Sequence, residues 1–204
     1  MTPARFIRTQ LPLTPLPDLP GVSLHLAAPT SGLSRLTTAT PYWAYVWAGG
    51  MALARYIRNH PDCVAGRRVL DLGAGSGLVG IVAAQAGARV QSAERDPLGR
   101  TAIRLNARAN GVPLLVLRRD VLAQVPPYID LILAGDVFYD AALVAPMLDI
   151  LTGAQARGVD CLIGDPGRRD LPLHRLSPVA RYQVRDFGQS RPVTGTVFTL
   201  RSPL

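Results

Sequence analysis

The segment with the most chemical content is a glycine-rich turn that follows a short apolar run. Val69 to Gly77 read VLDLGAGSG, and Asp71 stands two positions before Gly73, the first of three alternating glycines that also include Gly75. Glycine permits positive φ and lets the backbone approach a ligand closely, while a helix that begins at such a turn presents free amide groups. The segment therefore predicts a ligand-binding unit of strand, turn and helix.

Two kinds of ligand fit this turn. Gly75, Gly77 and Gly80 satisfy GxGxxG, the dinucleotide fingerprint, and a ribose-binding acid is expected about 20 residues further on, where Glu94 stands. The carboxylate of Asp71, however, suits the amino group of a methionine moiety and repels a pyrophosphate. S-adenosylmethionine carries no phosphate, and we interpret the turn as part of its binding site.

Acidic residues also follow the next predicted strands. Glu94, the only glutamate in the chain, ends the run ARVQSAE and can accept hydrogen bonds from both ribose hydroxyls. Asp120 follows PLLVLRR, where it can reach the adenine amino group or cap a helix. The carboxyl ends of parallel strands line the ligand crevice of an open α/β sheet. The cofactor-binding candidates are Asp71, Gly73, Gly75, Gly77, Glu94, Arg95, Asp120, Val121 and Asp136.

The segment GDVFYD, residues 135–140, lies where a methyl acceptor is expected to enter. Methyl transfer is an in-line displacement on a sulfonium, so the acceptor needs a free lone pair, which a lysine ammonium lacks. Forming the neutral amine at pH 7 costs roughly 4 to 5 kcal/mol. We predict that Asp136 orients the amine and helps release its proton, while Tyr139 or Trp43 holds the cationic form. Alternatively, Asp136 only caps the next helix, and Phe138 and Tyr139 fill the core.

The elements that must position these residues alternate between strand and helix. Helical spacing from Met51 to Ile57 ends at His60-Pro61. Apolar runs then predict strands at residues 67–73, 88–94, 113–120, 128–136 and 159–165, with helices at 78–87, 97–111 and 141–158. Such alternation indicates right-handed βαβ units and a parallel sheet.

The last part of the chain has a different pattern. The runs ARYQVRDF and TGTVFTLRS flank GQSRPV and predict a hairpin with a long turn. A dinucleotide-binding sheet more often continues with further strand and helix units, so the hairpin also favours a methyltransferase. The predicted fold is α/β: a Rossmann-like seven-strand methyltransferase sheet, mostly parallel, with a C-terminal antiparallel hairpin and helices on both faces.

The composition limits the number of domains, the cellular location and the kinds of partner that we expect for the chain. Its 204 residues suit one domain, and six of the 18 prolines fall within residues 1–40, which we predict to be an extended N-terminal arm before a domain at residues 41–204. No apolar run approaches the roughly 20 residues of a membrane span, and no signal-peptide stretch is present, so we expect a cytoplasmic protein. Two cysteines without CxxC spacing indicate neither a disulfide scaffold nor a metal site. The net charge is +8, but the arginines are scattered, so nucleic acid is not singled out as a partner.

With these residues in hand, the chain from about Pro41 to its end resembles the electron transfer flavoprotein β-subunit lysine methyltransferases, which are seven-strand, S-adenosylmethionine-dependent enzymes. Besides DLGAGSG, the resemblance covers PYWAYVWAGG at residues 41–50, NGV at 110–112, GDVFYD at 135–140 and GDPGR at 164–168. It implies that Trp47 lies near the cofactor, that Asp136 sits at the acceptor, and that the substrate is a protein, namely electron transfer flavoprotein. The chain departs from the family where Glu94-Arg95-Asp96 replaces Asp-x-Asp and Ala48 replaces a common proline.

Two other functions are compatible with the sequence. The same fold can methylate a small amine or a ribosomal protein. A module that binds the cofactor or RNA without turnover is a third reading, which the net charge of +8 suggests and which intact Asp136 and Tyr139 oppose.

Overall fold

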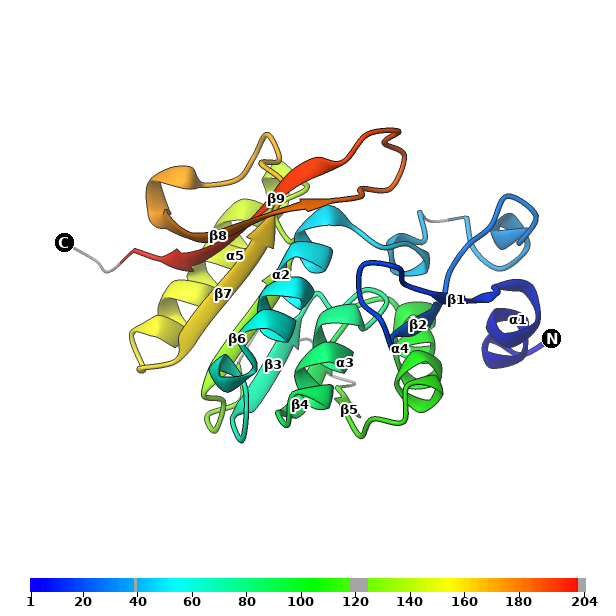
Figure 1. Ribbon diagram of the computed structural model, residues 1–204, viewed down its shortest axis with the longest axis horizontal. Coiled ribbons are helices and arrows are strands. Elements are labelled where there is room, and N and C mark those ends of the chain that lie inside the picture. Colours follow the sequence, from blue (N-terminus) through cyan, green and yellow to red (C-terminus); the bar gives the residue numbers. More distant parts are fainter. Residues whose placement is uncertain (39, 118–124, 202–204) are drawn as a thin grey trace.

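A seven-stranded sheet forms the centre of the computed structural model, which describes residues 1–38, 40–117 and 125–201. The strand order is β5-β4-β3-β6-β7-β9-β8 (Figure 1). Five strands are parallel, whereas β9 is antiparallel to both β7 and β8. The strands are β3 Arg68–Leu72, β4 Arg89–Ala93, β5 Leu115–Val116, β6 Leu131–Gly135, β7 Asp160–Asp165, β8 Leu176–Val184 and β9 Val193–Leu200. The predicted mostly parallel sheet with a C-terminal antiparallel hairpin is confirmed.

Helices cover both faces of this sheet, as predicted. Successive side chains of a strand point to opposite faces, so Val69 packs with α2 and α3, while Leu70 packs with α5. The helices are α2 Ala48–Asn59, α3 Leu78–Gln85, α4 Pro97–Ala109 and α5 Ala141–Gln155. Within the described parts of the chain, no helix is long and apolar enough to cross a membrane.

Residues 1–38 are folded rather than extended, which corrects the expectation of an extended arm for this part of the chain. They contain a helix, α1 Pro3–Gln10, and a hairpin of β1 Leu13–Pro15 and β2 Ser23–His25. Pro3 is the first residue of α1. At this position its missing backbone amide costs nothing, because that amide would have no partner within the helix. Phe6, Ile7 and Leu11 are buried beside α4. The tertiary contact with α4 therefore orders a segment that has little periodicity of its own.

Asn106 in α4 and Asn110, the C-cap of that helix, hold the N-terminal hairpin. Asn106 accepts a hydrogen bond from the backbone amide of His25 at 2.7 Å, and Asn110 accepts one from Ser23 at 2.9 Å. Asn106 is fully buried, and its amide group also donates to the backbone oxygen of Ser76 in the glycine-rich turn at 2.8 Å. One side chain thus connects the N-terminal hairpin to the predicted cofactor turn.

Candidate functional site

The glycine-rich turn joins β3 to α3 at the carboxyl edge of the sheet. Gly73, Gly75 and Gly77 have φ values of 67°, 53° and 84°, in the left-handed region that favours glycine. A Cβ added at Gly77 would stand 3.2 Å from Ile103, whereas one added at Gly75 would meet no atom closer than 3.9 Å. The turn therefore needs glycine for its conformation, whereas a side chain at Gly75 would meet no close neighbour.

Asp71 lies beneath this turn, within the protein interior. Its carboxylate accepts a hydrogen bond from the backbone amide of Gly80 at 3.0 Å, and the residue is only 1% exposed. Burial raises the pKa of Asp71 to about 7, although the amide of Gly80 favours the ionised form. The visible role of Asp71 is to join β3 to the first turn of α3, and its contact with a methionine amino group stays a prediction.

We expect Asp71→Asn to remove part of the pH dependence of stability. A carboxyl whose pKa is higher in the folded than in the unfolded chain binds more protons when folded, so the free energy of unfolding falls as pH rises from about 4 to about 7. Asparagine keeps an acceptor for Gly80 and does not ionise. Melting temperatures from pH 4 to 8 test this expectation: the wild type should lose stability relative to the variant as pH rises, and parallel curves contradict it.

Glu94 directly follows β4 and faces the turn. One carboxylate oxygen accepts from the amide of Gly75 at 2.9 Å, and the other accepts from the amide of Asp96 at 2.8 Å. Burial raises the pKa of Glu94, while these two amides oppose the shift. Each oxygen keeps a further lone pair, so the carboxylate can also accept hydrogen bonds from a diol.

A network of Asp136, Arg168 and Asp186, in which both carboxylates are buried and the guanidinium is partly exposed, lies just beyond the ends of β6, β7 and β8. Arg168 forms ion pairs with Asp136 at 2.9 Å and with Asp186 at 3.1 Å. Burial raises the pKa of Asp136 to about 6, although the positive charge of Arg168 counteracts this. Asp136 has a φ of 54°, a conformation uncommon outside glycine and tolerated best by Asp and Asn. Backbone strain of this kind often accompanies a functional role.

The turn after β7 explains why Arg168 points into this network. One carboxylate oxygen of Asp165 accepts from the backbone amides of Gly167 and Arg168, each at 2.7 Å. This local turn is formed by the GDPGR segment itself and fixes the backbone from which the Arg168 side chain extends. The guanidinium also lies 5.6 Å from the ring centroid of Trp47, which is a cation–π contact.

Helix α2 begins against the same network. Its N-cap, Trp47, provides no side-chain cap, and the free amides of Ala48 and Gly50 instead donate to Asp186 at 3.0 Å and Asp136 at 2.7 Å. Two carboxylates therefore stabilise the positive end of α2, and Arg168 compensates their negative charge.

This arrangement requires the backbones of α2 and β7 to touch. A Cβ added at Gly49 would stand 2.2 Å from the carbonyl oxygen of Gly164 and 2.6 Å from Asp136. We expect Gly49→Ala to destabilise the fold by more than about 2 kcal/mol and to displace Asp136, because backbone atoms cannot yield as side chains do. Gly153→Ala is the matched control, since its Cβ meets nothing nearer than 3.8 Å. Thermal melting should show a loss for the first variant and none for the second, and equal melting temperatures contradict the contact.

Five aromatic side chains form a continuous row beside the network, and we call them the aromatic cluster: Tyr42, Tyr45, Trp47, Tyr139 and Phe187. Ring centroids are 5.1 Å apart for Tyr139 and Tyr42, 5.7 Å for Tyr42 and Trp47, and 5.5 Å for Trp47 and Phe187. Tyr45 lies 3.8 Å from Phe187 and 6.2 Å from Trp47. Three members are exposed, so the row forms part of the surface.

The sequence-predicted residues fall into three groups. Gly73, Gly75, Gly77 and Glu94 meet at the turn, with Asp71 buried below it. Asp136 belongs to the network, and Trp47 and Tyr139 belong to the aromatic cluster. Burial raises the pKa of Tyr139, and the charge of exposed Arg95 opposes this shift. Asp120 and Val121 lie outside the described residues.

The structure also shows what the sequence reasoning missed. Trp43 is only 2% exposed and packs with Phe6 and Ile7, so Tyr42 rather than Trp43 lies beside Tyr139. Arg168, Asp186 and Phe187 had been given no role. The GDPGR segment was a signal for Arg168, whereas Asp186 is an ordinary acid at the end of a predicted strand.

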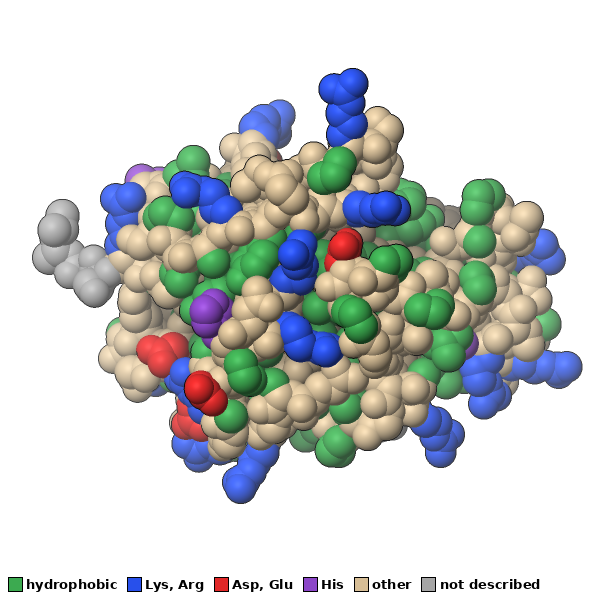
Figure 2. All heavy atoms as spheres, in the orientation of Figure 1, with side chains coloured by type: hydrophobic (Ala, Val, Ile, Leu, Met, Phe, Trp, Pro, Cys, Tyr) green, Lys and Arg blue, Asp and Glu red, His purple; other side chains and the backbone are tan. Residues whose placement is uncertain are grey.

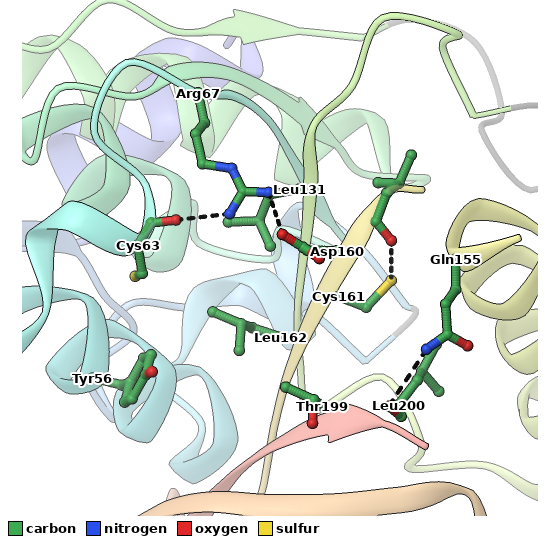
Figure 3. Close-up of a pocket in the computed structure, with 11 residues that line it drawn as sticks. Tyr56, Cys63, Arg67, Leu131, Gln155, Asp160, Cys161, Leu162, Thr199 and Leu200 are labelled. Carbon is green, nitrogen blue, oxygen red and sulfur yellow. Dashed lines mark hydrogen bonds and ion pairs between the residues drawn. The ribbon is translucent and has the colours of Figure 1, made fainter. Parts of the chain in front are cut away.

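A pocket of about 270 Å³ lies at the edge of the sheet opposite to the candidate site (Figure 3). It is lined by Leu131 and Asp160, the first residues of two parallel strands, and by Leu200 at the end of the antiparallel strand β9. An ion pair of 2.6 Å between Arg67 and Asp160 borders it. Because ligands of open α/β sheets bind at the carboxyl ends of the strands, this pocket is separate from the candidate site.

The strand order and the helices on both faces of the sheet are those of the class I methyltransferase fold. Solved methyltransferases share the fold: a T. thermophilus 16S rRNA methyltransferase in complex with AdoMet and guanosine has a TM-score of 0.56 at 23% identity, covering 78% of this chain and 44% of that one. Magnesium protoporphyrin IX methyltransferase from Synechocystis, with bound SAM, has a TM-score of 0.53 at 14% identity, covering 73% of this chain and 76% of that one.

The family model described as lysine methyltransferase matches residues 38–171, and the chain belongs to that family. Electron transfer flavoprotein beta subunit lysine methyltransferase of Danio rerio is 38% identical over 82% of this chain and 69% of its own length. The Xenopus laevis protein of the same name is 36% identical over 90% of this chain and 80% of its own length. A shorter match, 40% identical over 48% of this chain and 46% of the relative, is to a histone-arginine methyltransferase of Xenopus laevis.

Proposed function

We propose that this lysine methyltransferase transfers a methyl group from S-adenosylmethionine to a lysine of the electron transfer flavoprotein β subunit. The observation that carries the proposal is the position of Asp136, a buried carboxylate held by Gly50 and by Arg168, whose guanidinium also lies over the ring of Trp47. Relatives that cover most of the chain are named for that substrate. A cytoplasmic location, expected from the sequence, is part of the same proposal.

The carboxyl edge of the sheet fits the cofactor. The positive-φ glycines of the turn let its backbone approach a ligand closely, and Glu94 offers acceptor lone pairs for the ribose. The acids Glu94 and Asp71 disfavour a pyrophosphate at the same place. When bound, S-adenosylmethionine supplies an electrophilic methyl group on sulfur.

The protein's own residues act on the acceptor. The negative charge of Asp136 attracts the lysine ammonium, orients it and accepts a hydrogen bond as the proton leaves, while the ring of Tyr139 stabilises the cationic form. Arg168 restrains the Asp136 carboxylate, so its orientation need not be established when substrate binds. A carboxylate that is already oriented to accept from the departing proton matters, because only the neutral amine has the lone pair that attacks the methyl group.

The charge distribution supports a protein substrate over nucleic acid. On the face shown in Figure 2, basic side chains are spread over the surface instead of forming one stripe. All of them are arginines, because the chain has no lysine. A stripe that follows a phosphate backbone is the usual sign of a nucleic-acid site.

Labelled S-adenosylmethionine tests this function directly. The protein is incubated with purified electron transfer flavoprotein and, separately, with a host lysate, and labelled proteins are hydrolysed to identify the modified amino acid. We expect methyl-lysine in the β subunit. Labelled ribosomal protein or a small amine would change the proposed substrate, methyl-arginine would change the acceptor type, and absence of label contradicts the function.

A further inference from the structure

The end of β8 brings Phe187 to the candidate acceptor site. Phe187 lies beyond residues 38–171, the part of the chain that matches the family model. Its ring centroid is nevertheless 3.8 Å from that of Tyr45 and 5.5 Å from that of Trp47, and 49% of the residue is exposed. A single exposed aromatic is unremarkable in a protein, whereas one that extends a row of aromatic rings indicates a contact surface.

The backbone around Phe187 is fixed by Asp186. One carboxylate oxygen of Asp186 accepts from the amide of Phe187 at 3.1 Å and from that of Ala48 at 3.0 Å. The same side chain is paired with Arg168 and is only 5% exposed. Since Ala48 directly follows Trp47, this carboxylate ties the end of β8 to the backbone beside the aromatic cluster. Phe187 is therefore held in place before a substrate arrives, which reduces the entropy lost on binding.

The aromatic cluster extends from Phe187 to Tyr139, and Tyr139 follows Asp136 by three residues. An acceptor lysine that reaches Asp136 must lay its methylene chain along aromatic rings, which suits the amphipathic character of lysine. The residues on either side of that lysine must then lie further out, where Phe187 and Tyr42 are exposed.

We propose that Phe187 contacts the protein substrate beside the acceptor lysine and that Asp186 is the positioning residue that holds Phe187 there. The proposal rests on the proposed function, because it assumes that a protein segment enters at Asp136. The occupant is a segment of electron transfer flavoprotein that carries the acceptor lysine. Neither residue takes part in the bond changes of methyl transfer.

Phe187→Ala tests the contact. We expect the KM for electron transfer flavoprotein to rise roughly 10-fold, as for loss of an aromatic contact in an interface, while kcat and the Kd of S-adenosylmethionine change less than about two-fold. Phe187→Tyr keeps the ring and should restore the KM. Val179→Ala is the matched control, because Val179 is an exposed apolar residue of β8, the strand that precedes Phe187, and lies outside the aromatic cluster. An unchanged KM in Phe187→Ala contradicts the contact.

A double-variant cycle tests Asp186. We expect Asp186→Asn to raise the KM several-fold and to raise it much less when Phe187 is already alanine, because the two residues then act on one contact. A purely structural effect would give the same KM factor in both backgrounds and would overturn the positioning role. If Asp186→Asn does not fold, shown by melting and loss of cofactor binding, Asp186→Glu replaces it in the cycle.

The wild-type protein in the same series separates this proposal from the proposed function. If wild type methylates the flavoprotein and Phe187→Ala has the same KM, the contact is wrong and the function stands. If wild type labels a different protein, the KM comparison is made on that protein, and the same 10-fold criterion applies. If wild type labels nothing, both the function and the contact are contradicted.

Discussion

Replacing Asp136 by asparagine is expected to reduce methyl transfer by about 100-fold or more while the affinity for S-adenosylmethionine stays within a few-fold. Asparagine tolerates the positive φ of this position and can still accept from the amide of Gly50. The variant therefore removes mainly the negative charge that Arg168 restrains and that the acceptor amine requires. Single-turnover rates on electron transfer flavoprotein, together with calorimetry for the cofactor, measure the two effects separately.

The control for this variant is Asp149→Asn, which removes an exposed carboxylate of α5 that takes no part in the network. It should match wild type in rate, affinity and melting temperature. If Asp136→Asn also matches wild type in all three, Asp136 has only a structural role.

We also expect a pH effect on the transfer rate. Since the pKa of Asp136 is raised to about 6, the transfer rate of wild type should fall as pH decreases through that value.

Removal of the Glu94 carboxylate is the second large effect that we expect. Glu94→Ala should weaken S-adenosylmethionine binding by roughly 2 to 3 kcal/mol, or about 30- to 150-fold, because a charged acceptor of two ribose hydroxyls is lost. The amide of Gly75 also loses its partner, so the turn becomes less well fixed. Calorimetry with S-adenosylmethionine and with its demethylated product provides the measurement.

Glu94→Gln serves as the comparison for this variant. It keeps the size and one acceptor oxygen but removes the charge, so its affinity should lie between those of wild type and Glu94→Ala. NAD should bind none of the three proteins at concentrations where S-adenosylmethionine saturates wild type. An unchanged Kd in Glu94→Ala means that the ribose lies elsewhere, and comparable binding of NAD contradicts the assignment of the turn to S-adenosylmethionine.

Local sequence patterns determined much of the architecture and part of the site. Apolar periodicity predicted the strands, the helices and the C-terminal hairpin because that periodicity reflects which face of each element is buried. The glycines at 73, 75 and 77 predicted the turn because positive φ is a property of single residues. Glu94 was predicted to lie near the turn because parallel strands end at the same edge of the sheet, and its bond to Gly75 agrees with this.

Only the tertiary structure decided the contacts between distant segments. No local pattern indicates that Arg168 pairs with both Asp136 and Asp186, because these residues lie on separate strand ends that the sheet brings together. The burial of Trp43 and the order of residues 1–38 depend on packing against α4, which a proline-rich segment cannot reveal by its own periodicity. The position of α2 likewise depends on the backbone contact of Gly49 with Gly164, since two glycines far apart in sequence become informative only when the sheet and the helix meet.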